Sequence, residues 1–248
     1  MRRLAATVVA GLALSGSLLL GAPGSGVISH GPRDRRWVAL TFDADMTPGM
    51  LQLLRSGRVR SWYDAPIVRY LRRTRTPATI FVSGLWAETY PGVVRSLGRD
   101  PLFELANHSW DHAGWAGACY GLPAVRGTRR KRREVTWTAD IVRRLTGRRL
   151  RWFRFPGGCH TAADVRLVES LGERVVQWDV ISGDAYLRDP AAVAQQVLRL
   201  VRPGSIVVMH LVGAPNTPAT AGAVRRIVPA LRERGYRPVI LSRLLFQG

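Results

Sequence analysis

The chain has 248 residues, of which 46% are hydrophobic and 8% aromatic, so it can bury a sizeable core and is not an intrinsically disordered protein. Its formal net charge of +20 suits a protein that works near nucleic acid, an anionic membrane surface or an acidic cell-wall polymer. The basic residues are arginines with the single exception of Lys131. Because such a bias also arises from coding composition, we treat the charge as a modifier of function.

The N-terminus has the pattern of an export segment. Arg2 and Arg3 precede a mostly apolar stretch at 4–20. The arginines correspond to the charged part of a secretory signal, and the apolar stretch corresponds to its hydrophobic part. The small residues that follow do not form a clear cleavage site, so a signal peptide and an uncleaved membrane anchor both remain open. We expect residues 1–26 to engage the membrane during export and 27–36 to form a linker. The protein is then secreted or held at the cell surface.

The remainder of the chain alternates between two patterns. Short apolar runs rich in β-branched and aromatic residues predict strands at 38–42, 78–82, 102–106, 150–155, 174–178, 205–209 and 238–241. Helical spacing predicts helices at 128–145, 163–172, 189–202 and 219–235, with an irregular crossover at 50–75. This alternation predicts a single α/β domain over 37–248, with a parallel sheet that is either open and doubly wound or closed into a barrel.

Polar residues that can do chemistry lie where the predicted strands end. These residues are Asp43, Asp45, His108, His112, Arg154 and His210. Packing alone does not place acids and imidazoles at successive strand ends, whereas the active sites of parallel α/β folds are built at the carboxyl ends of the strands. The sequence therefore predicts one functional site at that edge of the sheet.

A metal ion is the first use that these residue types suggest. His108 and His112 are four residues apart and share a face if the segment is helical or turn-like, although this spacing alone is weak evidence. A carboxylate from Asp43 or Asp45 completes the two-nitrogen, one-oxygen set that catalytic zinc commonly uses. One acid can then bind the ion while the other removes a proton from water, unless either merely ends the strand in an Asx turn.

Five segments resemble the motifs of the polysaccharide deacetylases with a NodB homology domain, which form carbohydrate esterase family four. TFDAD at 41–45 resembles the motif T-F-D-D-G, with an alanine between the two aspartates, and NHSWDH at 107–112 matches N-H-[S/T]-x-x-H. RFPGG at 154–158 resembles R-x-P-[Y/F]-[G/A], with glycine in place of the aromatic residue. WDVISGDAY at 178–186 is a looser match to W-x-V-D-x-x-D-W, and IVVMH at 206–210 resembles a hydrophobic strand that ends in histidine.

The resemblance implies a fold and a role for each residue. The fold is a distorted (β/α) barrel of the NodB type. The implied ligands of a divalent ion, which is zinc or else cobalt or nickel, are Asp45, His108 and His112. The implied catalytic residues are the base Asp43, its partner Arg154, the acid His210 and the orienting Asp184, for which Asp179 is an alternative.

The activity that the resemblance implies is removal of acetyl groups from an N-acetylated polysaccharide. Export and positive charge favour a cell-wall glycan such as peptidoglycan over chitin-like polymers. We also expect the protein to be a monomer and to bind no nucleic acid. Two alternatives remain open, namely hydrolysis of acetyl esters on xylan-like glycans and a non-catalytic protein that binds a glycan or the cell wall.

Cys119 and Cys159 are the two cysteines of the chain. In an oxidising compartment they can pair, but two free buried thiols are equally compatible with the sequence.

Overall fold

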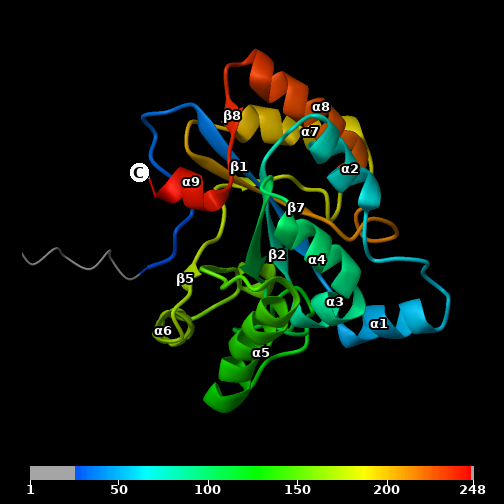
Figure 1. Cartoon of the computed structure of the whole chain (residues 1–248), viewed down its shortest axis with the longest axis vertical. Helices are drawn as coiled ribbons and strands as arrows, with labels where there is room; N and C mark the ends of the chain where they lie inside the picture. Colours follow the sequence, from blue (N-terminus) through cyan, green and yellow to red (C-terminus); the bar gives the residue numbers. More distant parts are fainter. Residues whose placement is uncertain (1–25, 247–248) are drawn as a thin grey trace, which may run out of the picture.

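The computed structural model describes residues 26–246 and shows one parallel sheet, curled into an incomplete barrel and surrounded by helices (Figure 1). The strands are β1 (Trp37–Ala44), β2 (Ala78–Val82), β3 (Phe103–Asn107), β4 (Trp152–Phe153), β5 (Arg174–Val175), β6 (Val180–Ile181), β7 (Ser205–His210) and β8 (Arg237–Pro238). They lie in the order β5-β4-β3-β2-β1-β7-β6, and β8 pairs with the first residues of β1. The predicted distorted barrel in a single domain is therefore confirmed.

Helices follow most of the strands and cover the outside of the sheet. They are α1 (Pro48–Arg55), α2 (Ala65–Arg73), α3 (Gly84–Thr89), α4 (Pro91–Arg99), α5 (Thr128–Thr146), α6 (Ala162–Ser170), α7 (Pro190–Leu200), α8 (Thr220–Glu233) and α9 (Leu241–Leu245). Several begin with a capping side chain. Thr47 accepts the N–H of Met50, and Asp189 accepts those of Ala191 and Ala192, which satisfies donors that the first helical turn leaves free.

Strand β1 shows how the sequence separates the two faces of the sheet. Val38, Leu40 and Phe42 belong to the large hydrophobic core beneath the outer helices. Because alternate residues of a strand face opposite sides, Thr41 and Asp43 point into the barrel. Both faces are covered, so the whole strand is apolar except at these inward positions.

Apolar residues fill the interior of the barrel up to the level of Asp43. They come from several strands and from α9, and they are Ala39, Phe81, Ala106, Trp152, Val176, Ile206, Val239, Leu241 and Leu244. Within this layer the indole N–H of Trp152 donates to Glu104, 3.0 Å away, and Glu104 also accepts a hydrogen bond from the hydroxyl of Ser242 in α9. The lower barrel is thus packed, which leaves the carboxyl ends of the strands to form the site.

The stretch 27–36, predicted as a linker, contributes to the barrel wall. Ile28 donates to the carbonyl of Val175 at 3.0 Å and accepts from the N–H of Gln177 at 2.8 Å, beside the edge strand β5. His30 forms an antiparallel bridge with Ser205, at the start of β7. The segment therefore fills the gap between the two ends of the curled sheet.

Several other local predictions differ from the structure. Helices α1 and α2 occupy much of the predicted irregular crossover at 50–75. Helices α3 and α4 occupy a stretch for which we predicted no helix, and the predicted last strand, 238–241, stops at Pro238 because Leu241 begins α9. The short strand β6 was not predicted. Residues 1–26, the predicted export segment, lie outside the described residues except for Gly26. No helix within residues 26–246 combines the length and apolar character needed to cross a membrane.

Candidate active site

The seven residues predicted from the sequence converge at the carboxyl end of the barrel. Asp45 follows β1 directly, while His108 and His112 lie on the loop after β3. The Nε2 atoms of the two histidines are 3.3 and 3.5 Å from Asp45 Oδ1. Among the described residues, neither Asp45 Oδ1 nor His108 Nε2 has a hydrogen-bond partner, although both atoms are buried. Buried polar atoms without partners are costly, so their convergence indicates a site for a bound cation.

The donor atoms of these groups also suit a metal ion. His108 Nδ1 donates to the backbone carbonyl of Arg154 at 2.9 Å, which directs Nε2 at Asp45. Burial lowers the pKa of His112 to about 4, so its imidazole is neutral near pH 7. Burial also acts against the charged form of Asp45, but the neighbouring histidines outweigh it and hold the pKa of that carboxyl well below its usual range. Burial acts against protonation of His108, but the charges of Asp43 and Asp45 outweigh it and raise its pKa, so a cation bound at Nε2 would displace that proton. Two imidazoles and one carboxylate are a typical ligand set for catalytic zinc.

A buried glutamate holds the loop that carries the two histidines. Ser109 and His112 adopt left-handed backbone conformations, with φ of 68° and 56°, which persist in non-glycine residues only where the surroundings enforce them. Glu134 of α5 accepts the hydroxyl of Ser109 and the N–H of Trp110, both at 2.8 Å, and the N–H of Asp111 at 3.3 Å. Glu134 is fully buried, although it follows a run of basic residues.

If the site holds a divalent cation such as zinc, Glu134→Ala is expected to weaken its binding about ten-fold, because three donors lose their acceptor and the histidine loop relaxes. Isothermal titration of metal-free protein with zinc measures the change. Asp140→Ala is the matched control on the same helix, since Asp140 pairs with Arg143 at the surface. Equal zinc affinity in wild type and Glu134→Ala would show that the loop holds its shape without this carboxylate.

Asp43 and Arg154 form a buried ion pair beside the cation site. Arg154 Nη1 donates to Asp43 Oδ1 at 2.7 Å and to Thr41 Oγ1 at 2.8 Å, while Nη2 donates to the carbonyl of Gln177 at 3.1 Å. The guanidinium also lies 3.9 Å from the ring centre of Phe81 and is fully buried. These contacts fix one oxygen of Asp43 and leave the other, Oδ2, 3.6 Å from His108 Nε2.

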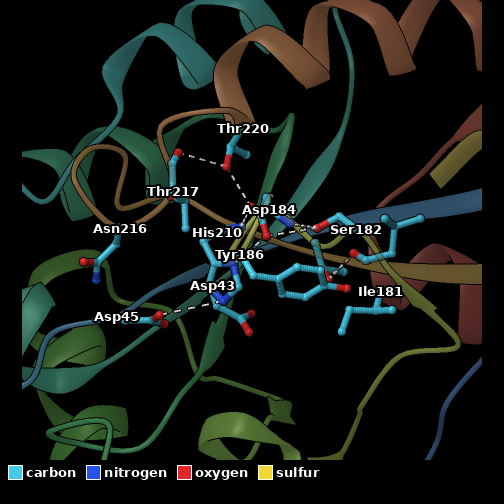
Figure 2. A network of polar contacts seen from close by, with 12 residues as sticks. Asp43, Asp45, Ile181, Ser182, Asp184, Tyr186, His210, Asn216, Thr217 and Thr220 are labelled. Carbon is cyan, nitrogen blue, oxygen red and sulfur yellow. Dashed lines mark hydrogen bonds and ion pairs between the residues drawn. The ribbon is translucent and has the colours of Figure 1, made fainter. Parts of the chain in front are cut away.

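His210 lies at the end of β7 and approaches the other carboxylate oxygen of Asp45 (Figure 2). Its Nδ1 donates to Asp184 Oδ1 at 2.8 Å, and its Nε2 lies 3.9 Å from Asp45 Oδ2. Burial would lower the pKa of His210, but the charge and hydrogen bond of Asp184 and the charge of Asp45 raise it to about 10. The imidazole is therefore held in its protonated form.

Two hydroxyl groups and one backbone group fix Asp184. Thr220 Oγ1 donates to Oδ2 at 2.7 Å, Ser182 Oγ donates to Oδ1 at 2.9 Å, and the N–H of His210 donates to Oδ2 at 2.8 Å (Figure 2). Nothing in the sequence marked Thr220 or Ser182, since hydroxyl residues are common in loops. Glu134 carries a signal in the sequence, because it is a lone acid that directly follows a run of basic residues.

The alternative partner of His210, Asp179, lies elsewhere. Its carboxylate pairs with Arg33 at 2.8 Å and accepts the hydroxyl of Ser205 and the N–H of Ile206. These contacts are at the start of β7, five residues from His210 along the strand. Asp184, and not Asp179, therefore orients the imidazole.

Cys119 and Cys159 form a disulfide bond. It joins the long loop between β3 and α5 to the turn Pro156–Gly158 that follows Arg154. The open question of the cysteines is thus answered in favour of pairing, and the cross-link lies beside the site.

Together, the fold and the site define an α/β barrel with an acid–base cluster of the hydrolase type at the carboxyl ends of its strands. The model of one family, described as polysaccharide deacetylase, matches residues 30–176. The chain belongs to this family, as the sequence motifs indicated.

Individual relatives agree with this assignment. A chitooligosaccharide deacetylase of Sinorhizobium fredii is 30% identical over 185 residues, which cover 70% of this chain and 81% of the relative. A peptidoglycan-N-acetylglucosamine deacetylase of Bacillus cereus is 25% identical over 215 residues, with 85% of this chain and 69% of the relative covered. Among solved structures, a pseudoenzyme of carbohydrate esterase family four from Bacillus anthracis has a TM-score of 0.75 at 22% identity, covering 91% of this chain and 70% of that one. This last likeness concerns the fold alone.

Proposed function

We propose that the protein is a metal-dependent hydrolase that removes acetyl groups from the N-acetylated sugars of a cell-wall polysaccharide. The observation that carries the proposal is the buried pair of atoms without hydrogen-bond partners among the described residues, Asp45 Oδ1 and His108 Nε2. An acid–base pair flanks them on each side, Asp43 with Arg154 and His210 with Asp184. The names of the relatives support deacetylation of a glycan as the reaction.

Asp45, His108 and His112 would hold the ion. The mixed nitrogen and oxygen donors suit zinc, and cobalt or nickel is also compatible with them. When bound, a divalent ion polarises the acetyl carbonyl and makes water more acidic.

The residues of the chain account for the remaining chemistry. Asp43 accepts the proton of the attacking water through Oδ2, because Arg154 occupies Oδ1. Protonated His210 donates from Nε2 to the departing amine, because Nδ1 is committed to Asp184. The N–H groups of Gly158 and Cys159 are used within their own turn, and we assign the N–H of Gly157 to the developing oxyanion.

The place of action and the substrate follow from the sequence. The export pattern at 1–26 supports a secreted or surface-held protein, and the net charge of +20 supports work in an anionic wall, hence peptidoglycan. We propose that the protein is a monomer and that it does not bind nucleic acid.

Acetate release tests the function directly. Zinc-loaded protein is expected to release acetate from N-acetylglucosamine oligomers or peptidoglycan, and a chelator is expected to abolish the release until zinc is restored. Acetylated xylan is the comparison, and faster release from it would identify the protein as an ester hydrolase. Release from neither substrate, with glycan binding retained, would support the non-catalytic alternative.

A further inference from the structure

The loop that the disulfide anchors presents an exposed tyrosine. Tyr120 follows Cys119 directly, and its side chain is 85% exposed. Its φ is 49°, a left-handed conformation that disfavours a residue with a side chain and that a glycine would adopt without cost. The disulfide holds the residue in this conformation through the neighbouring position.

The tyrosine ring lies over a glycine of the site. A Cβ placed on Gly157 would lie 2.6 Å from Cys119 Sγ and 3.0 Å from Tyr120 Cδ2. The disulfide and the ring therefore occupy the space that a side chain at position 157 would need. Motif R-x-P-[Y/F]-[G/A] has its aromatic residue at this position, so here an aromatic ring reaches the same place from a different loop.

The assignment of the Gly157 N–H to the oxyanion places Tyr120 next to the proposed reaction centre, because the tyrosine ring lies against this glycine. Gly157 also follows Arg154, whose guanidinium contacts Asp43 at 2.7 Å, by three residues. A second exposed ring, Tyr186, belongs to the connection that carries Asp184 and is 60% exposed. The loops that bear the two tyrosines belong to strands on opposite sides of β1 in the sheet order.

We propose that Tyr120 is a substrate-binding residue on which a pyranose ring of the polysaccharide stacks, next to the sugar that loses its acetyl group. The inference rests on the proposed function, since it names a residue that binds the same polymer. Aromatic rings attract the C–H groups on the face of a sugar ring, and a tyrosine has few torsions to freeze on binding. The disulfide fixes the loop before the substrate binds, so little conformational entropy of the loop is lost on binding.

A lone exposed aromatic residue is common on protein surfaces and needs no function. Tyr120 differs in three respects that a random surface ring does not combine. It has a left-handed backbone, it is adjacent to a cross-link, and it covers a glycine three residues from a buried site arginine.

The test compares long and short substrates. Tyr120→Ala is expected to raise KM for an N-acetylglucosamine hexamer about ten-fold, while kcat/KM for a small aryl acetate stays unchanged. Tyr120→Phe keeps the ring and is expected to match the wild type. Tyr70→Ala is the matched control, because Tyr70 lies on the outer helix α2 and donates to the carbonyl of Arg225.

A binding measurement separates this inference from the proposed function. Titration of the zinc-loaded protein in an Asp43→Asn background with the hexamer is expected to give a Kd about ten-fold higher when Tyr120→Ala is added. A ten-fold change in Kd without any acetate release by wild-type protein would refute deacetylation but support sugar binding by Tyr120. Unchanged KM and Kd in an active Tyr120→Ala protein would refute sugar binding by Tyr120 but support the deacetylase activity.

Discussion

Asp43→Asn is expected to lower kcat for acetate release about 10³-fold while zinc still binds. The amide keeps the shape of the carboxylate but cannot accept the proton of the attacking water, and loss of a positioned general base costs 10²- to 10⁴-fold. Arg154 is fully buried and would lose its charged partner, so the melting temperature is expected to fall by about 10 °C. Initial rates at 20 °C, with circular dichroism as a check on folding, give the comparison.

Asp45→Ala is the companion variant, because Asp45 stands two residues away with a different proposed role. It is expected to lose bound zinc together with activity, whereas Asp43→Asn retains zinc. Metal analysis of both purified variants distinguishes the roles. Full activity in Asp43→Asn would assign the base elsewhere, and unchanged zinc affinity in Asp45→Ala would assign the third ligand elsewhere.

Asp184→Asn is expected to reduce kcat about 10³-fold. It is also expected to move the alkaline limb of the kcat–pH profile to lower pH. Asp184 raises the pKa of His210, which reaches about 10, so the imidazole stays protonated and able to donate through neutral and mildly alkaline pH. Without the negative charge the folded-state pKa of His210 falls, and the proton is lost as pH rises through the lower value. Activity above neutral pH is therefore lost first, which a kcat–pH profile from pH 5 to 10 would measure.

Asp179→Asn is the matched control for this profile. Asp179 lies on the same connection before β7 but contacts Arg33 and Ser205 instead of His210. Its replacement is expected to lower thermal stability and to leave the shape of the kcat–pH profile unchanged. A profile that moves equally in both variants would mean that the shift arises from general destabilisation.

The site residues that could be predicted from the sequence are those close together in one loop or at the end of an apolar strand. His108 and His112 lie within one loop, and Asp43, Asp45 and His210 end strong apolar runs, so their meeting follows from parallel strands alone. Glu134 and Thr220 could not be assigned this way. Their partners, Ser109 and Asp184, are 25 and 36 residues away along the chain, and only the packing of α5 and α8 brings them together.

The choice between Asp179 and Asp184 shows the same limit. Both acids lie on the connection that contains β6, which runs parallel to β7. Asp179 therefore reaches Ile206 at the start of β7, and Asp184 reaches His210 at its end. Strand β6 is only two residues long, so no periodicity in the sequence fixes this register.

The segment that completes the barrel wall would also constrain the removal of the proposed export segment. Ile28 supplies both backbone hydrogen bonds to the edge beside β5, and the N–H of Gly26 donates to Glu169 at 3.0 Å. A peptidase that cut after Ile28 would leave the carbonyl of Val175 and the N–H of Gln177 without these partners. A cut ahead of Gly26 would leave the wall whole. If the chain is exported and processed as proposed, these contacts favour a mature N-terminus ahead of Ile28.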